Sequence, residues 1–214
     1  MIRRTFLALA PLAVLALAGC NNPSSSSSPS GSASTTAAKT EGKSLMLNGA
    51  GATFPYPLYS KWVSDYQAAA PSVRVNYQSV GSGAGIRQIS EKTVDFGASD
   101  APMTDEQLGK APAKLVHVPT TLGAVAVTYN LAGVDSLELT PEVLSAVFLG
   151  DIKKWDDPKI KALNPNAKLP AQAISVVHRS DGSGTTAVFT EYLSKVSEPW
   201  KTKVGSNTSV SWPA

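Results

Sequence analysis

The sequence predicts an α/β protein, because a short apolar strand, a glycine-rich turn and an amphipathic helix follow one another three times along the chain. The three turns occupy residues 49–55, 81–85 and 182–186. Before the second turn, apolar and polar residues alternate over residues 73–78, which is typical of a half-buried strand. After the first turn, apolar residues recur every four positions from Leu58, which favours a helix.

An export signal is expected in residues 1–20. Arg3 and Arg4 precede an apolar run over residues 6–17 that is too short to span a bilayer. The run ends in Leu-Ala-Gly followed by Cys20, which resembles the lipobox of bacterial lipoproteins. Because Cys20 is the only cysteine, an intramolecular disulfide is excluded and lipidation of Cys20 is expected. The alternative is a non-lipidated signal peptide with an incidental cysteine.

Residues 21–44 are predicted to form a disordered tether between this signal and the folded part. They are rich in Ser, Thr, Ala, Gly and Pro and contain almost no large apolar side chains that could support a core. Without Arg3 and Arg4 the chain has 17 basic and 16 acidic residues, a net charge of +1. This balance makes a basic nucleic-acid-binding surface unexpected, so any preference for anions must come from local groups.

Residues 178–186 have the composition of an anion site. Arg179 offers a planar fork of donors, and the hydroxyls of Ser183 and Thr185 can rotate to donate. Apolar spacing beyond the loop predicts that residues 184–186 form the first turn of a helix, whose unpaired N–H groups favour an oxyanion. Asp181 is expected to brace the side chain of Arg179. The alternative is an ordinary strand-to-helix turn with an N-cap.

A second candidate, Asp100, follows a predicted strand over residues 94–99. Ligands of open α/β sheets bind beyond the carboxyl ends of the strands, so Asp100 is a functional candidate; the alternative is a solvated turn aspartate. Nucleotide binding is not indicated. Phe54 stands where a dinucleotide fingerprint needs its third glycine, and Ile86-Arg87 replaces the Lys-Ser/Thr of a phosphate-binding loop.

Other elements are predicted from local signals. Further strands are expected at residues 115–118, 122–129 and 174–177, with residues 119–121 as a crossing between two lobes. Two helix starts are indicated, a capping box at Thr104 and an N-cap at Thr140 that is followed by a proline. Residues 151–170 have the composition of a loop.

Together these motifs resemble the phosphate-binding protein of the bacterial high-affinity phosphate ABC transporter. The resemblance is carried by residues 49–55, 81–83, 95–102 and 179–185, with further likeness at residues 148–150 and 154–157. It implies a two-lobed periplasmic binding protein of the type II-like class, with lobes at residues 45–120 and 121–214 that close on phosphate at a hinge. The phosphate ligands that it implies are Thr53, Phe54, Ser82, Asp100, Arg179, Ser183, Gly184 and Thr185.

The same resemblance implies the partners. These are inorganic phosphate, the permease subunits of an ABC transporter and, through Cys20, the outer face of a membrane or the periplasm; a monomer without cofactor or metal is expected. Members of this family are substantially longer, so we expect a chain truncated at the C-terminus, with the second lobe incomplete and the return segment of the first lobe missing.

Two other functions are considered beside phosphate binding: a receptor for another oxyanion and a serine-dependent hydrolase. A carboxylate at Asp100 can only accept, so it favours an anion that carries a proton, such as phosphate, over sulfate. A receptor for another tetrahedral oxyanion remains the alternative. A hydrolase with Ser183 as nucleophile and His178 as base is not expected, because a nucleophile elbow needs glycine at positions 181 and 185. His117 is interpreted as a strand residue, and no cluster has metal-ligand spacing.

Overall fold

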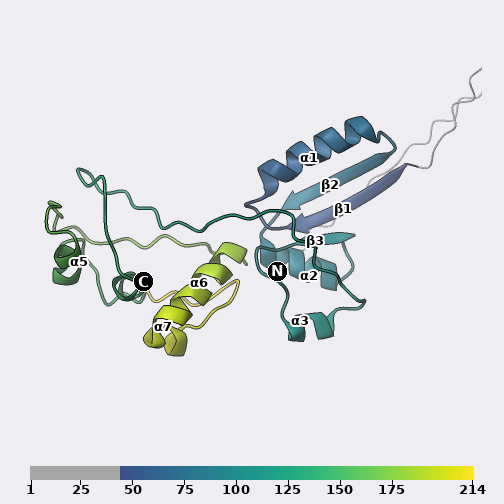
Figure 1. Ribbon diagram of the computed structural model, residues 1–214. Coiled ribbons are helices and arrows are strands. Elements are labelled where there is room, and N and C mark those ends of the chain that lie inside the picture. The colour runs from purple at the N-terminus through teal and green to yellow at the C-terminus, as the bar shows by residue number, and fades with distance from the viewer. Residues whose placement is uncertain (1–43) are drawn as a thin grey trace, which may run out of the picture. The chain divides into compact units, whose positions relative to one another are not determined.

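The computed structural model describes residues 44–214 and contains a parallel three-stranded sheet. The predicted signal and all of the tether before residue 44 lie outside the described residues. The strand order is β2-β1-β3, with β1 at Leu45–Gly51, β2 at Val73–Ser79 and β3 at Phe96–Ala98 (Figure 1). Gly49 of β1 pairs with Tyr77 on one side and Phe96 on the other. The predicted α/β class is therefore confirmed, and all three strand ends lie at one edge of the sheet.

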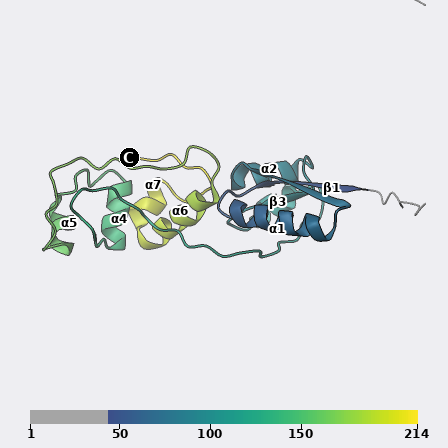
Figure 2. The same cartoon turned by 90° about the horizontal axis from the view of Figure 1, so that it is seen from above.

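Helices α1 (Tyr56–Ala69) and α2 (Ser82–Ser90) connect these strands and lie on opposite faces of the sheet (Figures 1 and 2). This arrangement follows from the strand order, because the right-handed crossovers from β1 to β2 and from β2 to β3 run in opposite directions across the sheet and so place their helices on opposite faces. A side chain at Gly85 would meet Ala98 O at 2.6 Å and Gly51 Cα at 2.7 Å. The lack of a side chain at Gly85 therefore lets α2 approach the sheet backbone closely.

Two predicted helix starts are confirmed. Thr104 caps α3 (Asp105–Lys110) by a capping box, in which its hydroxyl accepts from Gln107 N at 3.3 Å and its N–H donates to Gln107 Oε1 at 2.9 Å. Thr140 caps α4 (Pro141–Phe148), with Pro141 at the first helical position. Both caps satisfy backbone N–H groups that have no partner inside the helix.

A hydrophobic core forms around α4 and α5 (Pro158–Leu163). Its buried members are Val143, Val147, Ile152 and Ile160. The prediction of a loop over residues 151–170 is wrong at α5. Asp157 caps this helix by accepting from Lys159 N at 2.9 Å, and Ile160 is completely buried. The cap and the burial together stabilise a helix that is too short to form on composition alone.

The last two helices are α6 (Gly184–Val196) and α7 (Glu198–Lys203). The first turn of α6 lies where the sequence predicted it, but its buried face is formed by Thr186, Thr190 and Leu193, while Tyr192 is 41% exposed. Helix α7 was not predicted, and it buries Trp200 completely. Within residues 44–214, none of the helices combines the length and the apolar character needed to traverse a bilayer.

The predicted strands at residues 115–118, 122–129 and 174–177 are absent from the described part of the chain. Only an isolated antiparallel bridge, Lys154 to Ala173, lies near the last of them. A strand is stable only when its backbone groups pair with a neighbour. Within residues 44–214 these segments belong to no sheet, although Ile174 N donates to Lys153 O at 2.8 Å. Leu122 and Val177 are exposed, at 98% and 88%, whereas Ile174 and Val176 pack against the core around α4 and α5.

Candidate anion-binding site

The candidate ligands of the N-terminal sheet follow the ends of its three strands. Thr53 comes two residues after β1, Ser82 three residues after β2 and Asp100 two residues after β3. Because the strands are parallel, these residues are gathered at one edge, which is where α/β sheets bind ligands.

Asp100 is held by two hydroxyls. Ser82 Oγ donates to Asp100 Oδ1 at 3.3 Å, and Thr185 Oγ1 donates to Asp100 Oδ2 at 3.3 Å. Burial raises the pKa of the Asp100 carboxyl above its ordinary value, although hydrogen bonds from Ser82 and Thr185 and the positive charge of Arg179 act in the opposite direction. Each carboxylate oxygen has a further lone pair, so Asp100 can still accept a proton-bearing ligand oxygen.

Arg179 is braced by Asp181 on one side of its guanidinium group. Nε donates to Asp181 Oδ1 at 2.7 Å and Nη2 donates to Oδ2 at 2.5 Å, a bidentate pair. This hydrogen bonding raises the pKa of Arg179 and lowers the pKa of Asp181. Nη1 donates to Thr53 Oγ1 at 3.3 Å. The N–H groups of Arg179 that remain for a ligand are therefore those at the end of the fork, on Nη1 and Nη2.

Two glycine turns touch each other at the site. Gly83 N donates to Gly182 O at 2.8 Å. A side chain at Gly184 would lie 2.4 Å from Ser82 Oγ and 2.5 Å from the Asp100 carboxyl carbon. The absence of side chains at these positions allows the loop after β2, the loop after β3 and the start of α6 to meet.

Ser183 is the N-cap of α6. Its hydroxyl oxygen accepts from Thr186 N at 3.3 Å, and its own N–H donates to Thr208 O at 2.8 Å. Capping uses a lone pair and leaves the hydroxyl proton available to a ligand. The partial positive charge at this helix end also favours an anion.

The glycine turn after β1 supplies backbone N–H groups to the site. Among residues 44–214, neither Thr53 N nor Phe54 N donates to a protein acceptor. The Phe54 side chain is 44% exposed, and its ring lies against Gly123. The structure thus brings together Thr53, Ser82, Asp100, Arg179, Gly184 and Thr185, places Ser183 as a cap and leaves the Phe54 ring beside Gly123.

The geometry offers no support for the Ser183–His178 pair. The His178 ring stacks on Trp212 with 4.8 Å between ring centroids, and its Nδ1 donates to Arg179 O at 3.0 Å. No hydrogen bond joins His178 to Ser183 within residues 44–214. In the same part of the chain, no three His, Cys, Asp or Glu side chains are grouped so that they could hold a metal ion.

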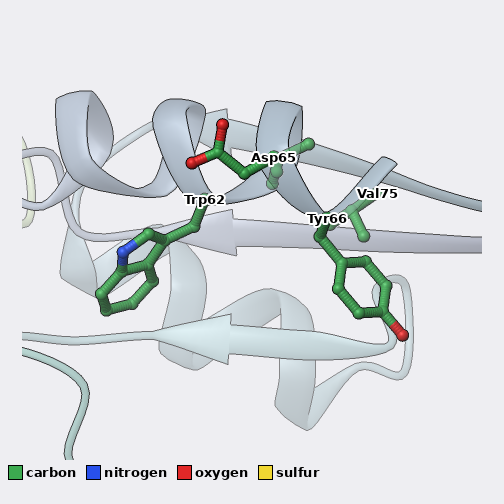
Figure 3. A pocket seen from close by; sticks show the side chains of 5 residues that line it. Trp62, Asp65, Tyr66 and Val75 are labelled. Atoms are coloured by element: carbon green, nitrogen blue, oxygen red, sulfur yellow. The ribbon is translucent and has the colours of Figure 1, made fainter. Parts of the chain in front are cut away.

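A shallow apolar hollow lies away from these groups. It is lined by Trp62, Val63, Asp65 and Tyr66 of α1 and by Val75 of β2 (Figure 3). Val75 pairs with Leu47 in the first half of β1, whereas the candidate ligands follow the strand ends. The surface of the hollow is almost entirely apolar and its one charged lining residue is Asp65, so it does not suit an oxyanion.

One residue of this region was missed by sequence reasoning. Tyr77 donates from its hydroxyl to Ala52 O at 2.6 Å, directly before the candidate ligand Thr53. The alternation of β2 indicated only that Tyr77 is half-buried. Its hydrogen-bond partner lies 25 residues away, so no local signal could have identified the contact.

Comparison with known proteins gives a consistent result. The family model of the PBP superfamily domain matches residues 26–210. The chain is 53% identical over 169 residues to the phosphate-binding protein PstS of Pasteurella multocida, covering 78% of this chain and 48% of the relative. It is 44% identical over 214 residues to PstS of Xylella fastidiosa, covering 97% of this chain and 58% of the relative. The chain therefore spans about half the length of the curated relatives it matches.

The fold is also similar to that of a solved structure. A crystal structure of a candidate phosphate ABC transporter substrate-binding protein from Clostridium perfringens, with bound phosphate, superposes with a TM-score of 0.50. The two sequences are 19% identical over the aligned part, which covers 69% of this chain and 56% of that one. At this identity the likeness supports the fold.

Proposed function

Since the chain belongs to the PBP superfamily, we propose that it binds inorganic phosphate outside the cytoplasm and delivers it to an ABC permease. The proposal is supported by the high identity to phosphate-binding relatives and by the residues that meet at the strand ends. The ligands proposed are Thr53, Phe54, Ser82, Asp100, Arg179, Ser183, Gly184 and Thr185. The protein acts as a receptor, without a catalytic step.

The observation that carries the proposal is the position of Asp100 among hydrogen-bond donors. Two hydroxyls hold its carboxylate; burial raises the pKa of Asp100, and the nearby positive charge of Arg179 offsets part of that rise. An anion at this place meets donors on several sides and one fixed acceptor. Phosphate near neutral pH retains a proton for that acceptor, whereas sulfate has none and is repelled.

Many dipoles, and not one ion pair, are proposed to stabilise the bound anion. Asp181 already offsets the charge of Arg179, through the bidentate contact. The anion therefore depends on N–H groups, hydroxyls and the N-terminus of α6 as replacements for its water. This arrangement binds a small oxyanion without a metal.

Calorimetric titration tests the proposal. The full-length protein is titrated with phosphate and, separately, with sulfate at pH 7 and fixed salt. We expect saturable binding of phosphate and roughly fivefold to a hundredfold weaker binding of sulfate, because an unpaired or repelled buried acceptor costs about 1–3 kcal/mol. Equal affinity for both anions would support the general oxyanion receptor, and binding of neither would reject the proposal.

Localisation and domain organisation complete the proposal. Cys20 anchors the mature protein to the membrane through a lipid, and residues 21–44 act as the tether. The folded part consists of lobes at residues 45–120 and 121–214 joined near residues 119–121. Tyr59 of α1 shares a hydrogen bond of 2.7 Å with Thr120, a contact that supports a role of this crossing in positioning the first lobe.

A further inference from the structure

Tyr77 reaches from β2 to the first turn of the candidate site. Its hydroxyl donates to Ala52 O at 2.6 Å, and Ala52 N donates to Ala98 O at 2.9 Å. Ala52 is 1% exposed. The residue before Thr53 is thus held by a side chain of β2 on its carbonyl and by the backbone of β3 on its N–H.

The carbonyl of Ala52 and the N–H of Thr53 belong to the same peptide group. This group is planar and trans, so the two bonds point in opposite directions. Fixing the carbonyl on the Tyr77 hydroxyl therefore fixes the direction of the Thr53 N–H, away from Tyr77. A donor on the carbonyl also polarises the peptide group and makes its N–H a better donor.

The ring of Tyr77 is itself held in place by other aromatic side chains. It stacks on Phe96 at 6.1 Å with an interplanar angle of 13°, and meets Tyr59 edge-on at 5.2 Å. A side chain at Gly49 would fall 2.1 Å from the Phe96 ring, so glycine at that position makes room for the cluster. Burial raises the pKa of Tyr77, with further contributions from Tyr59 and Asp100, so the hydroxyl keeps its proton.

We propose that Tyr77 is a positioning residue of the anion site, which presets the Thr53 N–H to donate to the ligand. The inference rests on the proposed phosphate binding. Without the hydroxyl, the peptide between Ala52 and Thr53 is free to tilt, and part of the binding free energy is used to reorient it. Tyr77 makes no contact with the anion in this account and acts only through the peptide group.

The test compares Tyr77→Phe with Tyr56→Phe. Tyr56 belongs to the same cluster, with its ring 6.3 Å from that of Tyr77, and its hydroxyl forms no hydrogen bond within residues 44–214. Loss of one hydrogen bond predicts that Tyr77→Phe weakens phosphate binding about 3- to 10-fold. Tyr56→Phe is expected to bind as the parent does, and calorimetry measures all three proteins.

A local readout separates positioning from a general effect on the fold. The amide resonances of Thr53 and Gly184 are followed by NMR during phosphate titration. We expect Tyr77→Phe to reduce the shift at Thr53 while the shift at Gly184 stays as in the parent. Equal changes at both amides, or an affinity equal to that of Tyr56→Phe, overturn the role of Tyr77. Failure of the parent to bind phosphate instead rejects the proposed function.

A second probe covers the case in which Tyr77→Phe does not fold. Incorporation of 3,5-difluorotyrosine in place of Tyr77 keeps the ring and the hydroxyl but makes the proton more acidic. A stronger donor on the Ala52 carbonyl should move the Thr53 amide resonance in the direction opposite to loss of the bond. An unchanged Thr53 resonance contradicts the proposal.

Discussion

Replacement of Asp100 by asparagine probes the selectivity of the site. In the structure, the carboxylate accepts from Ser82 and Thr185, both at 3.3 Å. Asn keeps the size and one accepting oxygen, but its NH2 group cannot accept, so one of the two hydroxyls must turn to another acceptor. Because both bonds are long, this loss costs about 0.5 kcal/mol, the lower end for a hydrogen bond. The larger effect is on the ligand, where a fixed acceptor and a negative charge disappear.

We expect Asp100→Asn to bind sulfate, with little change for phosphate. Losing the accepted phosphate O–H is partly offset by removing repulsion between two negative groups. The ratio of phosphate to sulfate affinity should fall by about 1–3 kcal/mol, roughly fivefold to a hundredfold. Calorimetry with both anions measures this ratio. Asp95→Asn is the matched control, since Asp95 accepts from Asn48 N at 2.8 Å and precedes β3.

The raised pKa of Asp100 also predicts how sulfate affinity changes with pH. As pH falls through the raised pKa of Asp100, the carboxyl takes up a proton and becomes a donor as well as an acceptor. Sulfate affinity of the parent should therefore rise on acidification, starting at a higher pH than for an ordinary aspartate, while Asp100→Asn stays flat. Between the ordinary and raised pKa values the folded state binds more protons than the unfolded state, so stability from this group falls as pH rises. A variant that still excludes sulfate, or a parent without this pH response, would refute the role of Asp100.

The remaining predictions address donors, packing and the anchor. Arg179→Lys should weaken phosphate binding about tenfold despite the same charge, because a point charge cannot reproduce the fork; equal affinity by calorimetry would remove Arg179 from the site. Gly184→Ala places a methyl group 2.5 Å from Asp100 and should abolish measurable binding, whereas Gly109→Ala, with nothing within 4 Å, should bind normally. If Gly184→Ala binds as the parent does, the close contact is not needed. Cys20→Ala should release the protein from membranes in a fractionation, and unchanged retention would contradict a lipid anchor.

Much of the N-terminal sheet could be predicted because its signals are local. The alternation over β2 and the glycine turns that follow β1 and β2 are readable within a few residues. The caps at Thr104 and Thr140 are likewise defined by residues three positions apart or fewer. The short helices α5 and α7 had comparable signals, an N-cap at Asp157 or Ser197 with a proline in the first helical turn. The composition of residues 151–170 favoured a loop at α5, and no element was predicted at α7.

The unpaired segments at residues 115–118, 122–129 and 174–177 show the limit of pattern reasoning. Alternating apolar residues indicate that a segment can be a strand, whereas the ladder depends on a partner that the pattern does not identify. In the candidate site, too, local features could be predicted and long-range contacts could not. Glycine turns and strand ends predicted where Thr53 and Asp100 would lie, whereas the strand predicted before Arg179 is absent from residues 44–214. Long-range contacts such as Tyr77 to Ala52 depend on the completed sheet.

The most direct test of phosphate binding at these strand ends is a crystal structure of the full-length protein grown with phosphate. The account predicts one phosphate ion within about 2.6–3.2 Å of the Thr53 N–H, the free end of the Arg179 fork and an Asp100 carboxylate oxygen. Asp181 should remain on the other side of Arg179, as in the present structure. Phosphate bound elsewhere, or at this place without contact to Asp100, would contradict the account.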